Sequence, residues 1–131
     1  MNSPAQDVKD ILEGASSATG LEFGVDLFCF LQPDSPDQCV TIFDTGGYPN
    51  QPNYRLEMPT IQVRVRGAPK KYRDAYTIAE SVREVLRETH NTSVNGTKYI
   101  GFWVMSDIFP LGYDEKNRPE FSINFRLQRT V

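Results

Sequence analysis

The stretch from residue 59 to residue 87 constrains the fold more than any other part of the chain. Residues 59–67 alternate apolar and polar side chains with a period of two, which is typical of a strand with one buried face. Residues 70–87 repeat apolar side chains at spacings of three and four, which predicts a helix with one apolar stripe. Such a stripe is buried when the helix packs on a sheet. We therefore predict an α+β fold with this long central helix on one face of a sheet.

A second, shorter helix is predicted at the amino terminus, from Pro4 to about residue 16. Ser3 is a favourable N-cap, and proline is well tolerated at the first helical position. Val8 and Leu12 belong to the side that we expect to pack on the rest of the fold. We expect Asp7 on the opposite, polar side, where its charge favours the start of the helix.

The remaining strands are predicted from short runs of β-branched and aromatic residues. Residues 25–30 and 39–43 flank the turn-forming residues 33–37, which predicts a β-hairpin. Residues 98–106 are apolar on both faces, as in a central strand or one covered by a neighbouring subunit, and residues 107–112 continue extended. Residues 119–128 alternate cleanly. We expect a mixed, mostly antiparallel sheet of about five to six strands within a single domain spanning residues 1–131.

Residues 44–58 are predicted to form a long loop, because prolines and two adjacent glycines interrupt any regular pattern there. A loop of that length in a compact domain is usually functional or disordered. Its tyrosines and prolines are typical of surfaces that contact other proteins. The candidate contact residues in this loop are Tyr48, Tyr54 and Arg55.

Charge and hydropathy exclude several classes of protein. The chain has 14 basic and 17 acidic residues, a net charge of −3, which argues against a general binder of nucleic-acid phosphates. The amino terminus lacks the basic and apolar regions of a signal peptide. The longest wholly apolar run, residues 102–105, is far shorter than the ~20 residues of a membrane helix. We therefore expect a cytosolic protein without a membrane segment and without a DNA-recognition helix.

Acidic residues in the turns raise the possibility of calcium binding. Asp34, Asp37 and Asp44 lie near one another in sequence, yet the spacing, glycine and terminal glutamate of an EF-hand are missing. Solvated turn acids are the better interpretation, and we predict no metal site and no cofactor.

The cysteines and the histidine do not form a recognisable catalytic or zinc site. Cys29 and Cys39 lack an activating neighbour, and they would remain thiols in a reducing cytosol. His90 stands where the central helix is expected to end, without a nearby nucleophile or metal ligand. We predict that the protein is not an enzyme, with a small uncharacterised enzyme as the remote alternative.

Five sequence blocks together resemble one protein family. They are residues 46–49 (Gly-Gly-Tyr-Pro), the strand at 59–67, Ala75-Tyr76 in the central helix, residues 111–121, and residues 124–126. This combination resembles the tail terminator or "minor capsid" proteins of long-tailed bacteriophages. The resemblance implies a mixed sheet with helices packed on it, which agrees with the prediction from periodicity.

The resemblance also implies a structural role in the virion. Family members form a six-membered ring at the head-proximal end of a non-contractile tail, stop tube polymerisation and dock the head-completion protein. The implied partners are further copies of the chain, the major tail tube protein and that head-completion protein, with assembly in the host cytoplasm. DNA would only pass through the ring, and we expect acidic or neutral groups to line that channel. The alternative is another neck component, such as a connector or head-completion protein.

Two arginines of the predicted strand at 59–67 are further contact candidates. Arg64 and Arg66 fall on its polar face, where guanidinium groups suit bidentate pairing with acids of a neighbouring subunit. A strand face exposed only to water remains the alternative.

Overall fold

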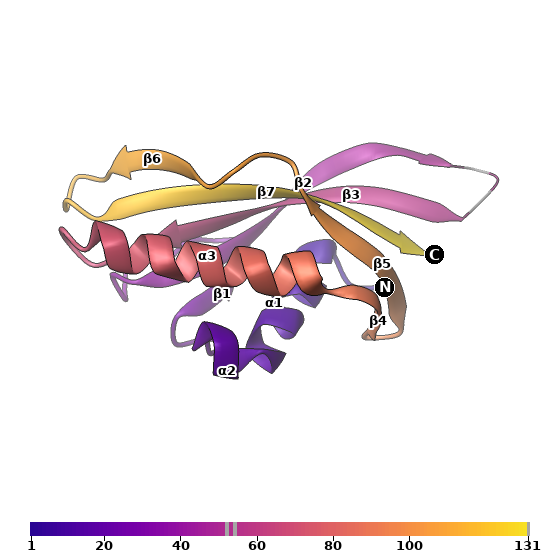
Figure 1. Cartoon of the computed structure of the whole chain (residues 1–131), viewed down its shortest axis with the longest axis horizontal. Coiled ribbons are helices and arrows are strands. Elements are labelled where there is room, and N and C mark those ends of the chain that lie inside the picture. Colours follow the sequence, from indigo (N-terminus) through magenta and orange to yellow (C-terminus); the bar gives the residue numbers. More distant parts are fainter. Residues whose placement is uncertain (52, 54, 131) are drawn as a thin grey trace.

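The computed structural model describes residues 1–51, 53 and 55–130, and it confirms the α+β class (Figure 1). Helix α3 is the long central helix, and α1 is the predicted amino-terminal one. In chain order the elements are α1 (Pro4–Gly14), α2 (Ser16–Thr19), β1 (Leu27–Cys29), β2 (Cys39–Gln51), β3 (Leu56–Arg66), α3 (Tyr72–Glu88), β4 (His90–Val94), β5 (Thr97–Val104), β6 (Phe109–Tyr113) and β7 (Pro119–Thr130).

The described residues form one mixed sheet of seven strands. Its order is β1-β2-β3-β7-β5-β4, and β6 also pairs with β7. Strand β7 is long enough to pair with β3 along one edge and with both β5 and β6 along the other. The sheet is antiparallel except for β1 and β2. Strand β4 was not predicted from the sequence, because His90–Val94 carries few apolar residues.

The predicted hairpin between residues 25–30 and 39–43 is wrong. Strands β1 and β2 are parallel, with Leu27 opposite Val40 and Cys29 opposite Ile42. Because the two strands run in the same direction, the chain must return to the end of the sheet where β1 starts before β2 can begin. Residues 30–38 make this return. Turn-forming residues occur in such a return segment as well as in a tight hairpin, so composition alone did not distinguish them.

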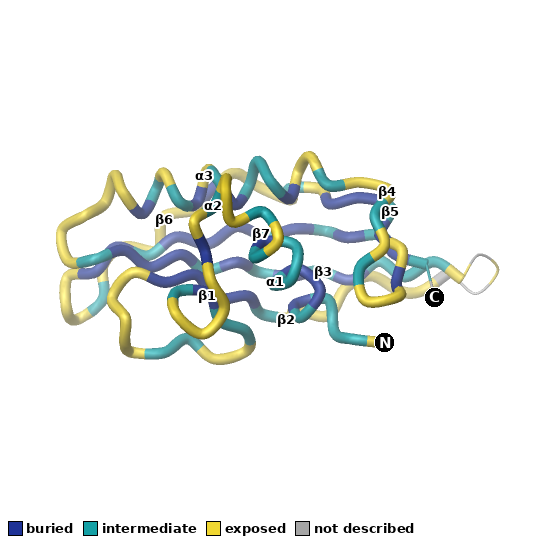
Figure 2. Tube along the Cα trace, turned by 90° about the horizontal axis from the view of Figure 1, so that it is seen from below, coloured by how far each residue is buried: buried dark blue, intermediate teal, exposed yellow. Residues whose placement is uncertain are grey.

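The helices lie on one face of the sheet and leave the other face without a helix (Figure 1). Ala75, Ala79, Val82 and Leu86 of the α3 stripe are buried, and the inward-facing side chains of β3 and β7 are buried with them (Figure 2). The rings of Tyr76 in α3 and Phe121 in β7 lie edge to face at 5.7 Å. The alternation predicted for the two strands is confirmed by the buried residues Ile61, Val63, Val65, Phe121, Ile123, Phe125 and Leu127.

Helix α1 begins as predicted but presents one acid inward. The Ser3 side chain accepts from the backbone N–H of Gln6, whose side chain accepts from the Ser3 backbone, which is a capping box. The expectation that Asp7 faces solvent is wrong, because its side chain is buried and bonded to the Tyr99 hydroxyl and, at 2.8 Å, to Asn95. The helix is thereby anchored to the β4–β5 hairpin by a polar contact that apolar periodicity does not reveal.

The predicted loop at residues 44–58 is also wrong, because most of it belongs to β2 and β3. The two strands form a long antiparallel hairpin whose register shifts after Asp44 and again after Tyr48. Gly47 lies at the first shift with a φ of +147°, and a Cβ there would stand 2.5 Å from the carbonyl oxygen of Met58. Glycine is therefore required by this bulge. Gly46 and Gly47, which suggested a loop, lie where the register first shifts.

Candidate assembly surfaces

Strand β6 forms an exposed apolar edge of the sheet. Among the described residues it pairs only with β7, so its second edge carries backbone groups without a strand partner. Phe109 and Tyr113 are 59% and 58% exposed, and Leu111 between them is also exposed. Tyr113 packs on Tyr72 of α3, with ring centroids 6.5 Å apart. An exposed apolar edge strand of this kind is prone to pair with another chain.

The β2–β3 hairpin projects from the other side of the sheet. It extends past the ends of the neighbouring strands in Figure 1, and we call the part from residue 44 to residue 59 the arm. Strand β1 covers the outer edge of β2 only from Val40 to Ile42 within the described chain. Tyr48 is exposed on the arm, and Arg55 is exposed at its turn with a φ of +49°. Tyr54, the third contact candidate here, lies outside the described residues.

The two arginines of β3 differ in their surroundings. Arg64 is half-buried on the uncovered face, where its Nε–H donates to Oε1 of Gln62 at 3.1 Å. Arg66 was expected on the same wet face, and that is wrong, since it is only 3% exposed. Its guanidinium donates to the carbonyl oxygens of Pro36 and Asp37 at 2.7 and 2.8 Å. Arg66 therefore holds the 30–38 segment in place inside its own chain.

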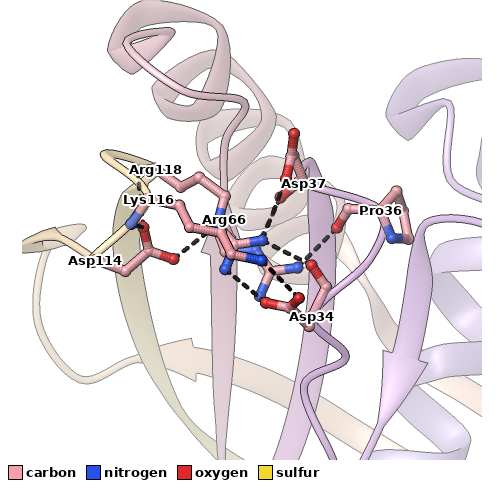
Figure 3. A network of polar contacts seen from close by, with 7 residues as sticks. All are labelled: Asp34, Pro36, Asp37, Arg66, Asp114, Lys116 and Arg118. Carbon is pink, nitrogen blue, oxygen red and sulfur yellow. Dashed lines mark hydrogen bonds and ion pairs between the residues drawn. The ribbon is translucent and has the colours of Figure 1, made fainter.

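A second arginine, Arg118, holds the same segment (Figure 3). The Arg118 side chain is 5% exposed and contacts three carboxylates, those of Asp114 at 2.7 Å, Asp34 at 3.1 Å and Asp37 at 3.2 Å. Nη1 of Arg118 also donates to the Asp34 carbonyl oxygen at 2.7 Å. We call these residues, together with Lys116, the Arg118 cluster. It joins the β6–β7 turn, part of the block at 111–121, to residues 34–37.

Two carboxylates of the Arg118 cluster, those of Asp34 and Asp114, are stabilised in their charged form. The hydrogen bond from Lys116, followed by that from Arg118, holds the pKa of Asp34 below its usual range. Desolvation raises the pKa of Asp114, but hydrogen bonds from Arg118 and from the Lys116 backbone outweigh it, so that pKa is also lowered. Two of the three turn acids considered for calcium, Asp34 and Asp37, thus pair with Arg118.

The two cysteines and Asp44 lie outside the Arg118 cluster. Cys29 and Cys39 are free thiols, and burial raises the pKa of Cys29 to about 11. Asp44, the third turn acid, accepts a hydrogen bond from the Ala5 backbone at 2.9 Å, away from the Arg118 cluster. No group of three or more potential ligands gathers among the described residues. None of the described helices has the length and apolar character needed to span a bilayer.

Comparison with known proteins identifies the family. A family model described as bacteriophage tail terminator protein matches residues 16–131. A chain from the virion of a native gene transfer agent particle superposes with a TM-score of 0.79 at 11% sequence identity, covering 98% of this chain and 96% of that one. A second solved chain aligns with a TM-score of 0.53 at 14% identity, over 95% and 96% of the two chains. No curated protein matches the sequence.

The chain is a structural protein of a phage tail. It belongs to the bacteriophage tail terminator family, as residues 46–126 already suggested. The fold shared with the gene transfer agent component agrees with that assignment.

Proposed function

We propose that six copies of this chain form a ring at the head-proximal end of a non-contractile phage tail. The ring stops polymerisation of the tail tube and offers a docking surface to the head-completion protein. Membership of the tail terminator family supports this role. The chain acts as one domain and has no catalytic function in this proposal.

Two unlike free edges of the sheet are the observation that carries the ring proposal. Strand β6 presents one of them, on the side of β7 where the sheet otherwise ends in β4, and the outer edge of the arm presents the other on the far side. A contact between two different patches is heterologous, and such contacts generate a closed ring when the rotation between copies closes. Burial of Phe109, Leu111 and Tyr113 against the next copy would remove an exposed apolar edge.

The arm provides the contacts beyond the edge itself. Tyr48 supplies aromatic area, and Arg55 supplies a guanidinium that suits carboxylates of a neighbouring copy or of the tail tube protein. Tyr54 belongs to the same contact in this proposal. Assembly takes place in the host cytoplasm, before the tail joins the head and DNA passes through the ring.

The length of tail tubes grown in vitro tests the proposal. Purified tube protein is polymerised with and without this chain, and tube lengths are measured by electron microscopy. We expect the wild-type chain to shorten the tubes. Leu111→Glu places a charge on the β6 edge and should abolish the effect, whereas Val25→Glu, at an exposed apolar site before β1, should not. Tubes of unchanged length with the wild-type chain would contradict the proposal.

A further inference from the structure

The uncovered face of the sheet is rich in hydrogen-bond donors. The registers of β3, β5 and β7 place their outward side chains together on the side opposite the helices. We call this surface the open face. Its members are Thr60, Gln62, Arg64, Lys98, Trp103, Asn124, Arg126 and Gln128, while Ser122 on the same side is buried.

The open face is positively charged although the whole chain has a net charge of −3. Arg64, Lys98 and Arg126 are its cations. The registers of these described strands place one carboxylate, that of Glu120, on this side. Glu120 lies at the end of the face, opposite the buried Arg66. Arg64 and Arg126 have no ion pair with a carboxylate in the described chain. The overall charge therefore conceals a cationic surface.

Aromatic rings hold the two guanidinium groups against the sheet. The Arg126 guanidinium carbon lies 5.2 Å from the centre of the Trp103 ring, and that of Arg64 lies 5.7 Å from the centre of the Phe43 ring. Between them, Nε2 of Gln62 donates to Oδ1 of Asn124 at 3.4 Å. Stacked guanidiniums of this kind lose little conformational freedom when they bind an anion, because they are already ordered.

We propose that the open face binds the phosphate backbone of double-stranded DNA. Guanidinium, ammonium, amide and hydroxyl groups are the side-chain groups that contact nucleic-acid phosphates, and these groups make up most of the face. The inference rests on the proposed function, since it names the surface that the passing DNA touches. It reverses the expectation of an acidic or neutral channel. It also assigns Arg64 to DNA and not to a carboxylate of the next copy.

The salt dependence of binding follows from the number of cations. The three cations would neutralise three phosphates per chain. A plot of the logarithm of the binding constant against the logarithm of the salt concentration should then have a slope of about −2.7. Affinity should then fall about 40-fold between roughly 50 and 200 mM salt. The contacts are independent of base sequence, so duplexes of different sequence should bind equally.

Fluorescence anisotropy of a labelled duplex of about 20 base pairs tests this inference. Arg64→Gln with Arg126→Gln should weaken binding at least tenfold at low salt and reduce the slope to about −0.9. The matched control, Arg73→Gln with Arg87→Gln, removes the same charge from α3 on the helical side and should bind like the wild type. Lys98→Gln, at an exposed site, should reduce the slope by about 0.9.

Equal binding by the open-face variant and the α3 control would overturn the inference, as would absence of binding by the folded wild-type chain at low salt. A third outcome would also overturn the inference: the open-face variant no longer self-associates in light scattering but still binds DNA. That result would assign the face to a second copy. The tube-length assay contains no DNA. Failure of DNA binding is therefore distinguishable from failure of the proposed function.

Discussion

Arg118 donates from Nε to Oδ2 of Asp114 at 2.7 Å, across the turn that connects β6 to β7. The same guanidinium reaches Asp34 and Asp37, which precede Arg118 by 84 and 81 residues. One buried side chain thus fixes both the end of the exposed β6 edge and the segment that makes β1 parallel to β2. The shape of this end of the molecule depends on that guanidinium.

Replacement of Arg118 by lysine should lower the midpoint of thermal unfolding by several degrees. A lysine ammonium is compact and does not reproduce the forked contacts of a guanidinium, so part of the cluster would be left buried without a partner. Lys116→Gln is the control, because Lys116 makes an exposed ion pair with Asp34 and such pairs contribute little. Equal midpoints for the wild type and Arg118→Lys would contradict a structural role for the cluster.

The Arg118 cluster should also make stability depend on acid pH. The pKa values of Asp34 and Asp114 are lowered in the folded chain, so their contribution is complete above the unfolded value of about 4 and is lost as pH falls through the folded values. Urea unfolding of the wild type and of Asp114→Asn at pH 7 and pH 3 measures this effect. The difference in stability between the two proteins should be larger at pH 7 than at pH 3, and an equal difference at both pH values would count against the charge-based explanation.

Arg64 and Arg66 should respond very differently to substitution by alanine. Arg66→Ala leaves the carbonyl groups of Pro36 and Asp37 without their donors, at a cost of about 1–3 kcal/mol in the free energy of unfolding. Arg64→Ala removes a half-buried side chain from the open face and should change stability by less than about 1 kcal/mol. Chemical denaturation followed by tryptophan fluorescence compares the two. Equal losses would show that Arg66 is not held as described.

Gly47→Ala should disrupt the base of the arm. The residue has a backbone conformation that favours glycine, and its new Cβ would clash with the Met58 carbonyl oxygen. We expect faster amide hydrogen exchange in residues 44–59 while β7 keeps its protection. Gly14→Ala provides the control, because nothing lies within 4 Å of a Cβ there. Unchanged exchange in the arm would refute the bulge.

The Cys29 thiol should react slowly in the folded protein. Burial raises its pKa to about 11, compared with about 8.5 for an unperturbed thiol. Alkylation by iodoacetamide at pH 8, followed by mass spectrometry, should therefore be much slower in the native chain than in urea, and it should accelerate as pH approaches 11. Similar rates in native and unfolded chains would argue against the buried position of Cys29.

Much of the fold was predictable because its main elements have strong periodicity. Helix α3 and strands β3 and β7 pack apolar stripes against one another, and each stripe is readable from local sequence. The resemblance to tail terminators was likewise carried by residues in these elements and in the β6–β7 turn. The family assignment was therefore within reach of the sequence.

The missed features depend on contacts between distant residues. Asp7 is buried because Tyr99 and Asn95, some 90 positions away, supply its hydrogen bonds. Arg66 is buried because the 30–38 segment folds over it, and that segment is fixed in turn by Arg118. The arm was mistaken for a loop because glycine at a bulge and glycine in a loop look alike in sequence. The charge of the open face became visible only when strand registers were known.

Electron microscopy of the purified chain mixed with tail tubes is the most direct test of the central claim. End views of the capped tubes, averaged without imposed symmetry, report how many copies sit at the tube end. We predict a closed ring with six-fold symmetry at one end of each tube. Bare tube ends, or density without rotational symmetry, at saturating concentrations of the folded chain would contradict it.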